Sequence, residues 1–388
     1  MATFGGASIF GRAVKVSTVR DPVERQENGY SGLNGVESLS LGSRGGTSTV
    51  TGLLTGESAM AGVPHVRGVR LDSGEELLAD LVVDARGPRS SSDDWLAAVG
   101  AGPVAEELHE SGIVYFSRFY RMGDAAARPP SFAIAAADLG YLKFAIFMGD
   151  NDTFSVTYAV DRDDEWLRRR LADSDVFEAV AREIPGIAPW RAEGAAEPIT
   201  GVQVMAGLRN RFRPLVGADG SPLVHGFVAV GDAAVCTNPL YGRGCTLAIV
   251  HAYGLADALR EYGADLDASA RSFAAFTDRE VVPWFRSAVV QDAQARAMQD
   301  AAGADLAPDD PRAFMREVFR DGLLPAVRTS PVVFRAFVRW FNLLATPESL
   351  MQDPAVVADV MAAYQDRENR PEPPPAGPGR DELLAAIA

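Results

Sequence analysis

One stretch constrains the fold of this chain more than any other: an apolar run that ends in Gly-Asp and leads into a glycine-punctuated helix start. The run Gly226–Gly231 encloses four apolar residues, which is typical of a buried strand in a parallel sheet. Gly231 and Asp232 then stand at the carboxyl end of that strand, where open α/β sheets bind their ligands. A long helical pattern begins near Gly244. The segment therefore predicts a strand, a ligand-facing turn and a helix.

The residue types of this segment suit a flat, polar ligand. Asp232 is able to accept hydrogen bonds from sugar or polyol hydroxyls, and Pro239 fixes the loop. Gly242 and Gly244 let the backbone approach a planar group because they carry no Cβ. Cys245 follows at the helix start, where free N–H groups and the helix dipole favour negative charge. The alternative is an ordinary strand-to-helix turn with an Asp N-cap.

This stretch, Gly226–Ala258, resembles the second FAD fingerprint of the para-hydroxybenzoate-hydroxylase-like flavoproteins. That superfamily includes aromatic hydroxylases, squalene-epoxidase-like enzymes, flavin-dependent halogenases and geranylgeranyl-reductase-like enzymes. The resemblance implies that Asp232 binds the ribityl or sugar hydroxyls of FAD. It also implies that the loop from Pro239 to Gly244 packs along the isoalloxazine, and that the following helix stabilises the reduced, anionic ring.

A second segment, Ala79–Ser90, resembles the strand of the same superfamily that ends in Asp-x-x-Gly beside the cofactor. Asp84 and Gly87 take those positions here. The hydroxylase version has an Asp directly before the Gly, where this chain has Arg86. This difference from the hydroxylase motif argues against direct handling of NADPH and points towards the halogenase-like and reductase-like branches. NAD(P)H is kept as the candidate electron donor.

The family's N-terminal dinucleotide-binding motif is not found in residues 1–46. The Gly cluster between Gly5 and Gly11 has the wrong spacing for Gly-x-Gly-x-x-Gly, and no apolar strand precedes it. A βαβ unit needs about 30 residues or more with a strand and a 3.6-period helix. Because that motif holds the pyrophosphate of FAD in the family, we expect FAD binding to be weakened.

A run of strand patterns typical of an antiparallel sheet lies between the two motifs, and helical patterns follow the second motif. The expected fold is α/β (α+β), with an incomplete FAD-binding three-layer ββα sheet domain, an antiparallel-sheet substrate domain and a helical C-terminal region. The expected boundaries are an atypical or poorly ordered segment at 1–46, a partial FAD-binding domain at 47–105 and 201–300, a substrate domain at 106–200, a helical region at 301–370, and a linker and tail at 371–388.

Aromatic residues crowd the predicted antiparallel sheet, and in the family that sheet walls the substrate pocket. We expect some of them to contact an apolar or aromatic substrate, although alternate residues of any strand face the core. Lys143 lies in an apolar strand, but the Trp-x-Trp-x-x-Pro motif of halogenases is absent. No catalytic side chain is assigned. The aromatic set is Tyr115, Phe116, Phe119, Tyr120, Tyr141, Phe144 and Phe147.

Charge and composition exclude several function classes. The chain has 388 residues with 37 Lys and Arg against 52 Asp and Glu, a formal net charge of −15 that disfavours nucleic acid as a partner. Cys236 and Cys245 form no disulfide framework, so a reducing cytoplasm is the expected location. No secretory signal or membrane-spanning run is found. The four histidines lack metal-ligand spacing, and no metal is expected.

The apolar segment from Val332 to Leu344 carries only Arg335 and Arg339 as charges. Burial in the fold, as a lid, is the favoured interpretation, and lying on a membrane surface is the alternative. The function expected from sequence is an FAD-dependent monooxygenase acting on a small aromatic or lipophilic molecule. The alternatives are a geranylgeranyl-reductase-like enzyme and a truncated, non-catalytic remnant that does not hold FAD. The oligomeric state is left open.

Overall fold

The computed structural model describes residues 14–17, 37–40, 49–123, 136–263, 265–302, 314–315, 317–370 and 375–387. The chain divides into two compact units. Unit 1 comprises residues 1–109 and 209–289, and unit 2 comprises residues 110–208 and 290–388. Each unit has its own hydrophobic core.

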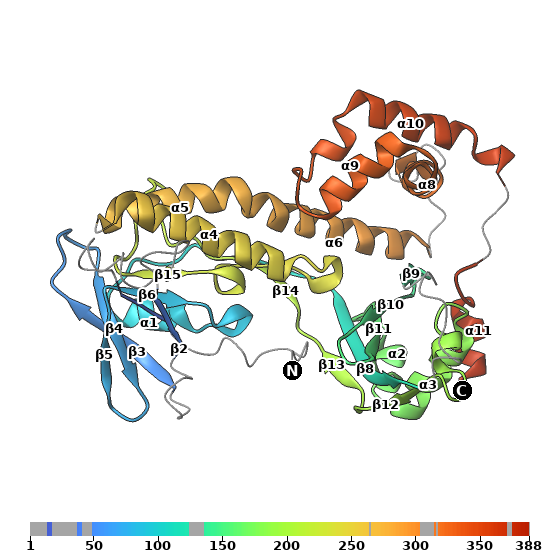
Figure 1. The fold of residues 1–388 in the computed structure, drawn as a ribbon, viewed down its shortest axis with the longest axis horizontal. Helices are drawn as coiled ribbons and strands as arrows, with labels where there is room; N and C mark the ends of the chain where they lie inside the picture. Colours follow the sequence, from blue (N-terminus) through green and yellow to red (C-terminus); the bar gives the residue numbers. More distant parts are fainter. Residues whose placement is uncertain are drawn as a thin grey trace. The chain divides into compact units, whose positions relative to one another are not determined.

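Unit 1 is built around a sheet with the strand order β15-β6-β1-β2 (Figure 1). β15 (Phe227–Ala229) pairs in parallel with β6 (Leu81–Asp84), and the register places Ala229 opposite Asp84. β1 (Val14–Ser17) pairs antiparallel with both β6 and β2 (Glu37–Ser40). Because β6 and β15 are parallel, their carboxyl ends lie at the same edge of the sheet, where both predicted motifs begin.

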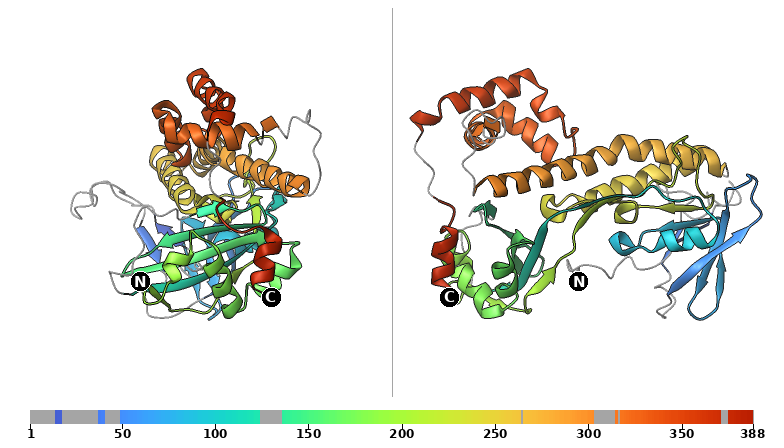
Figure 2. Two further views of the ribbon diagram at one scale, coloured as in Figure 1. Left: turned by 90° about the vertical axis from the view of Figure 1, so that its right-hand side faces the viewer. Right: turned by 180° about the vertical axis from the view of Figure 1, so that it is seen from behind.

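Two helices cover one face of this sheet. α4 (Gly244–Tyr262) and α5 (Leu266–Glu280) lie side by side over β6 and β15 (Figures 1 and 2). Gly254 permits this close approach, because a Cβ there would lie 2.3 Å from the Phe276 ring. The buried contact between sheet and helices is formed by Leu81, Val83, Val228, Leu255, Ala258 and Phe273.

A β-meander and one short helix cover the opposite face. Val82 and Phe227 point into this second core, as expected for strands whose alternate residues face opposite sides. The meander consists of β3 (Val50–Gly56), β4 (His65–Leu71) and β5 (Glu76–Leu78), and the helix is α1 (Ser92–Ala98). A further small sheet has the order β16-β14-β7, with β16 (Val235–Cys236), β14 (Arg209–Phe212) and β7 (Glu107–Glu110).

Unit 2 contains the predicted antiparallel sheet, with the order β12-β8-β11-β10-β9 and β13 also paired to β8. One face of this sheet packs against α2 (Glu165–Arg170) and α3 (Ser174–Glu183), around fully buried Phe116, Tyr158 and Phe177. The strands are β8 (Ile113–Met122), β9 (Ala136–Asp138), β10 (Leu142–Met148), β11 (Thr153–Asp161), β12 (Ala196–Pro198) and β13 (Gln203–Met205).

The C-terminal part of unit 2 is helical and has a small core of its own. Its elements are α6 (Val282–Ala302), which begins in unit 1, η7 (Val318–Leu323), α8 (Leu324–Thr329), α9 (Pro331–Phe341), α10 (Pro354–Gln365) and α11 (Arg380–Ala386). Within the described residues, every helix is too short or too polar to cross a bilayer.

The mixed α/β class, the antiparallel sheet and the helical C-terminal region predicted from sequence are confirmed. In the segment predicted as linker and tail, residues 380–386 form the short helix α11. Leu383 and Ile387 of this segment are buried in the core beneath α3, and Arg380 pairs with Asp164. The expectation of a poorly ordered segment at 1–46 lies outside the described residues, apart from β1 and β2. So does the predicted linker, apart from Pro375.

The burial of Leu383 makes a prediction about stability. Its side chain is fully buried against the sheet of unit 2, so Leu383→Ala removes packing and leaves a cavity. We expect a loss of about 2–4 kcal/mol in the free energy of unfolding. Urea denaturation measures the loss, with exposed Ala385→Ser on the same helix as the control. Equal midpoints for the two variants would show that the tail does not pack.

Candidate functional site

The turn after β15 is held tightly against α4. Gly231 has φ +57°, and a Cβ at this position would lie 2.9 Å from the Cβ of Ala248 on α4. A larger residue would therefore be strained twice, by its backbone conformation and by its contact with the helix. The glycine allows the strand to end directly beneath the first turns of α4.

Asp232 projects from this turn towards the start of α4. Its Oδ1 lies 3.8 Å from the point that a Cβ on Gly244 would occupy. Burial raises the pKa of Asp232 above its ordinary value, and the positive charge of Arg211 opposes this shift only in part. Among the described residues no hydrogen bond to the Asp232 carboxylate is recorded. The site thus holds a half-buried carboxylate for which the described part of the chain supplies no recorded donor.

The loop between Asp232 and α4 is fixed from within. The Asn238 side chain accepts a hydrogen bond from the Leu240 N–H, and Gly242 adopts a left-handed conformation with φ +65°. No atom lies within 4 Å of a Cβ built on Gly242. At Arg243, where α4 begins, no side chain caps the helix, so the first N–H groups have no side-chain acceptor. Cys245, in that first turn, is exposed.

His251 locks the Gly-Asp turn to the two helices. Its Nδ1 accepts the Gly231 N–H at 3.1 Å, and its Nε2 lies 2.8 Å from the Thr277 hydroxyl. Because that hydroxyl donates to the Phe273 carbonyl, it receives the Nε2 proton, which defines a neutral imidazole. The ring is 1% exposed and stacks on Phe273. Burial lowers the pKa of His251 to about 4.

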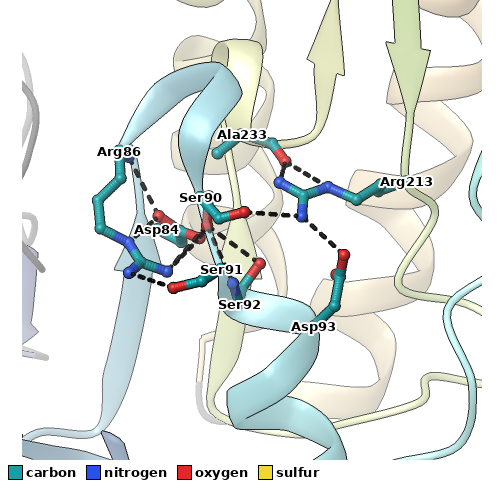
Figure 3. Close-up of polar contacts among 8 residues, drawn as sticks. All are labelled: Asp84, Arg86, Ser90, Ser91, Ser92, Asp93, Arg213 and Ala233. Atoms are coloured by element: carbon teal, nitrogen blue, oxygen red, sulfur yellow. Dashed lines mark hydrogen bonds and ion pairs between the residues drawn. The ribbon is translucent and has the colours of Figure 1, made fainter. Parts of the chain in front are cut away.

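The second aspartate, Asp84, is bound within the fold (Figure 3). Arg86 donates to Oδ1 through its backbone N–H at 3.1 Å and its Nε at 3.0 Å, and the Ser90 hydroxyl donates to Oδ2. Burial alone would raise the pKa of Asp84. The hydrogen bonds from Arg86 and Ser90, with the charge of Arg86, outweigh burial and hold the pKa below its ordinary value. Gly87, with φ +75°, begins the next turn.

Arg213 joins the two loops that follow β6 and β15 (Figure 3). Its guanidinium is 3% exposed and donates to the Ala233 carbonyl from Nε at 3.1 Å and from a terminal nitrogen at 2.6 Å. The other terminal nitrogen donates to the Ser90 carbonyl at 3.2 Å and to the Asp93 carboxylate at 2.9 Å. One side chain therefore holds both motif-bearing loops in a fixed relation.

All eight residues predicted from sequence belong to unit 1. Gly231, Asp232, Gly242, Gly244 and Cys245 lie on the turn and the helix start that face each other, with Pro239 in the loop between them. Asp84 and Gly87 lie on the neighbouring loop, where Asp84 is satisfied by protein groups. Their roles toward a cofactor stay predictions.

Sequence reasoning missed Arg213 and the polar role of His251. Both act through contacts with residues at least 20 positions away, which no local pattern reveals. Burial raises the pKa of the Cys236 thiol to about 12, so this cysteine is held as a neutral packing residue.

An apolar pocket in unit 1 lies beside β15 and is separate from this turn. His251 and Arg213 contribute to its wall, but none of the eight predicted residues does. Its remaining lining is mostly apolar and includes Phe212, Leu215, Val224, Phe227, Val228, Phe273 and Ala274.

No family model matches the chain. Protein Rv3254 of Mycobacterium tuberculosis (strain ATCC 25618 / H37Rv) is 27% identical over 305 residues. The match covers 75% of this chain and 60% of that protein, so the chain spans less than two thirds of the length of this curated relative.

Several solved structures are similar in part. The flavin-dependent brominase Bmp2 has a TM-score of 0.48 at 18% identity, with 83% of this chain and 70% of that chain covered. PqsL, a probable FAD-dependent monooxygenase from Pseudomonas aeruginosa, has a TM-score of 0.42 at 17% identity, with 66% and 63% covered. A variant of HpxO from Klebsiella pneumoniae, complexed with FAD, has a TM-score of 0.43 at 14% identity, with 81% and 68% covered. These overlaps are partial.

The two aspartates of the site make opposite predictions for stability. Asp84→Asn removes a paired buried charge and should lower the free energy of unfolding by about 1–3 kcal/mol at neutral pH. Asp232→Asn removes a desolvated charge and should raise it slightly. The pKa of Asp232 is higher in the folded than in the unfolded chain. The destabilisation caused by its buried negative charge is therefore absent well below about pH 4 and grows as pH rises. Urea denaturation at neutral and acidic pH measures both variants, and destabilisation by Asp232→Asn would show a structural partner for that carboxylate.

His251 predicts a loss of stability in mild acid. Its pKa is about 4 in the fold and about 6.5 in the unfolded chain. Stability is therefore complete above about pH 6.5 and falls by up to ~3 kcal/mol as pH approaches 4. His251→Gln should flatten this part of the profile of unfolding free energy against pH. The control is His109→Gln, whose imidazole is exposed beside Glu107; an unchanged slope in His251→Gln would contradict the assignment.

Proposed function

We propose that this chain is an FAD-dependent oxidoreductase of the monooxygenase type that acts on a small aromatic or lipophilic organic molecule. The observation that carries the proposal is the pairing of Asp232 with the bare start of α4. A carboxylate with no recorded donor among the residues that the structure describes faces Gly244, at the uncapped end of a helix of 19 residues. This arrangement supports a ligand that offers hydroxyl donors on one side and a flat, electron-rich edge on the other.

The residues of the turn fit the ring and ribityl portions of FAD. Asp232 would accept hydrogen bonds from ribityl hydroxyls, and the first N–H groups of α4 would donate to the polar edge of the ring. Gly242 has open space where a Cβ would stand, so the loop leaves room for a planar group. When bound, FAD would supply the electron-transfer chemistry that protein side chains lack, with NAD(P)H as the candidate reductant.

The face of the unit 2 sheet opposite to α3 is the proposed substrate surface. The strand register places Tyr115, Ser117 and Phe119 on the face opposite to α3, beside Thr157 of β11 and Phe147 of β10. Ser117 and Thr157 share a hydrogen bond of 2.8 Å, so the middle of this face is small and polar between aromatic side chains. Such a surface suits a flat apolar molecule with few polar groups. Lys143 shares the face, but its ammonium pairs with Asp138.

Flavin titration tests the site. We expect the purified chain to bind added FAD, measured by quenching of flavin fluorescence. Asp232→Asn should weaken binding by roughly 10–100-fold, since it replaces a charged acceptor worth about 1.5–3 kcal/mol. Gly244→Ala should weaken binding on the order of tenfold without loss of stability, because its methyl enters the slot while alanine favours the helix.

The matched control is Asp257→Asn, an isosteric change on the outer side of α4, where Asp257 pairs with Arg260. It should bind FAD as the parent does. Absence of binding by the parent chain would favour the remnant interpretation. Binding that all three variants retain in full would place the flavin elsewhere.

The reaction type is decided by a second measurement on the flavin-loaded protein. A monooxygenase consumes oxygen when NAD(P)H and an aromatic substrate are added. A geranylgeranyl-reductase-like enzyme instead saturates a double bond of the substrate without oxygen uptake.

A further inference from the structure

Helix α9 presents an apolar surface to solvent at helical spacing. Phe334 is 52% exposed, and Val338 and Phe341 follow it by four and seven positions. Leu344, just past the helix end, is 66% exposed. Residues at i, i+4 and i+7 lie on one side of a helix, so Phe334, Val338 and Phe341 form one stripe, and Leu344 follows it in the sequence. We name Phe334, Val338, Phe341 and Leu344 the α9 stripe.

The other side of α9 is anchored in the protein. Val333 is fully buried, and Ala336, Phe337 and Trp340 pack against the core formed with α10. The helix N-terminus is capped by Ser330, which accepts hydrogen bonds from the N–H groups of Val332 and Val333. The α9 stripe is therefore held outward by a folded support. Burial within the fold, which the sequence favours for this segment, applies to one side of the helix, and that side packs against the neighbouring C-terminal helices.

The sequence segment that contains the stripe carries charge of one sign. Residues 322–347 contain Arg328, Arg335 and Arg339 and no acidic residue, in a chain whose net charge is −15. All three arginines are exposed, and among the described residues none of them has a recorded ion pair. At 100° per residue, Arg335 and Arg339 flank the stripe on the same side of the helix. An apolar strip bordered by unpaired arginines is the pattern of a helix that lies in a membrane interface.

We infer that α9 docks onto the surface of an anionic lipid bilayer, with the α9 stripe inserted between headgroups and the three arginines against lipid phosphates. Charge complementarity selects this partner. An isologous contact with a second copy would bring the same arginines of both copies together, which is repulsive. The acidic remainder of the chain is repelled by anionic lipid, so the docking should be weak, local to α9 and sensitive to salt.

Co-sedimentation with vesicles tests the inference, using the full chain without added flavin so that the result is independent of the proposed function. We expect the protein to sediment at low salt with vesicles of phosphatidylcholine mixed with phosphatidylglycerol. It should sediment far less with phosphatidylcholine alone. The double variant Arg335→Gln/Arg339→Gln should bind the mixed vesicles about 25-fold more weakly, at about fivefold per arginine. Phe334→Ser/Phe341→Ser should lose about 100-fold or more, because two inserted aromatic side chains are removed.

Two controls separate the stripe from general surface effects. Phe147→Ser changes an aromatic side chain of unit 2 that is 59% exposed, and Arg121→Gln removes an exposed arginine of β8. Both should bind vesicles as the parent does, and circular dichroism confirms that every variant is folded. Two results would overturn the inference: no sedimentation of the parent at low salt, or equal sedimentation of all variants. A concentration-dependent dimer that the Phe variant abolishes, without vesicle binding, would assign the stripe to a second copy instead.

Discussion

The buried guanidinium of Arg213 is the interaction on which the geometry of the candidate site depends. Parallel pairing brings β6 and β15 to the same edge, but pairing ends at Asp84 and Ala229. Beyond that point the chain turns away in two separate loops. Arg213 donates to a carbonyl of each loop and to Asp93 at the start of α1. Four hydrogen bonds from this buried guanidinium go to acceptors in fixed positions, and removal of Asp93 would leave its charge without an ionic partner.

His251 performs the corresponding task on the helix side. By accepting the Gly231 N–H, it ties the turn to α4 at a position two helical turns from Gly244. The turn that carries Asp232 is thus fixed from two directions: its carbonyl at Ala233 by Arg213, and its amide at Gly231 by His251. Neither bond involves the carboxylate of Asp232. The backbone is rigid while the side chain keeps its acceptors available, which is the division of labour that a preformed binding site needs.

The sequence predicted what depends on local pattern. The strand before Gly231, the helix from Gly244 and the antiparallel strands of unit 2 follow from runs and periods of apolar residues, and the structure has them. It did not predict Arg213, because an arginine directly after β14 has no signature of its own. It also missed α11, whose Leu383 and Ile387 become a core only when α3 is there to cover them. Long-range contacts decide both cases. In the second case, the proline-rich residues just before α11 favour a linker, which hides the helix that follows.

The electrostatics of the turn narrow the class of ligand further. The charges that act at this turn are the carboxylate of Asp232, the positive charge of Arg211 and the partial positive charge at the start of α4, about half an elementary charge. A phosphate group would meet repulsion from Asp232, which Arg211 and the helix end oppose. A neutral sugar alcohol and a polar ring edge meet no such penalty, since one donates to the carboxylate and the other accepts from the helix. The turn is therefore suited to a neutral group, and in the proposed complex the uncharged portion of FAD would lie there while its phosphates would need contacts elsewhere in the fold.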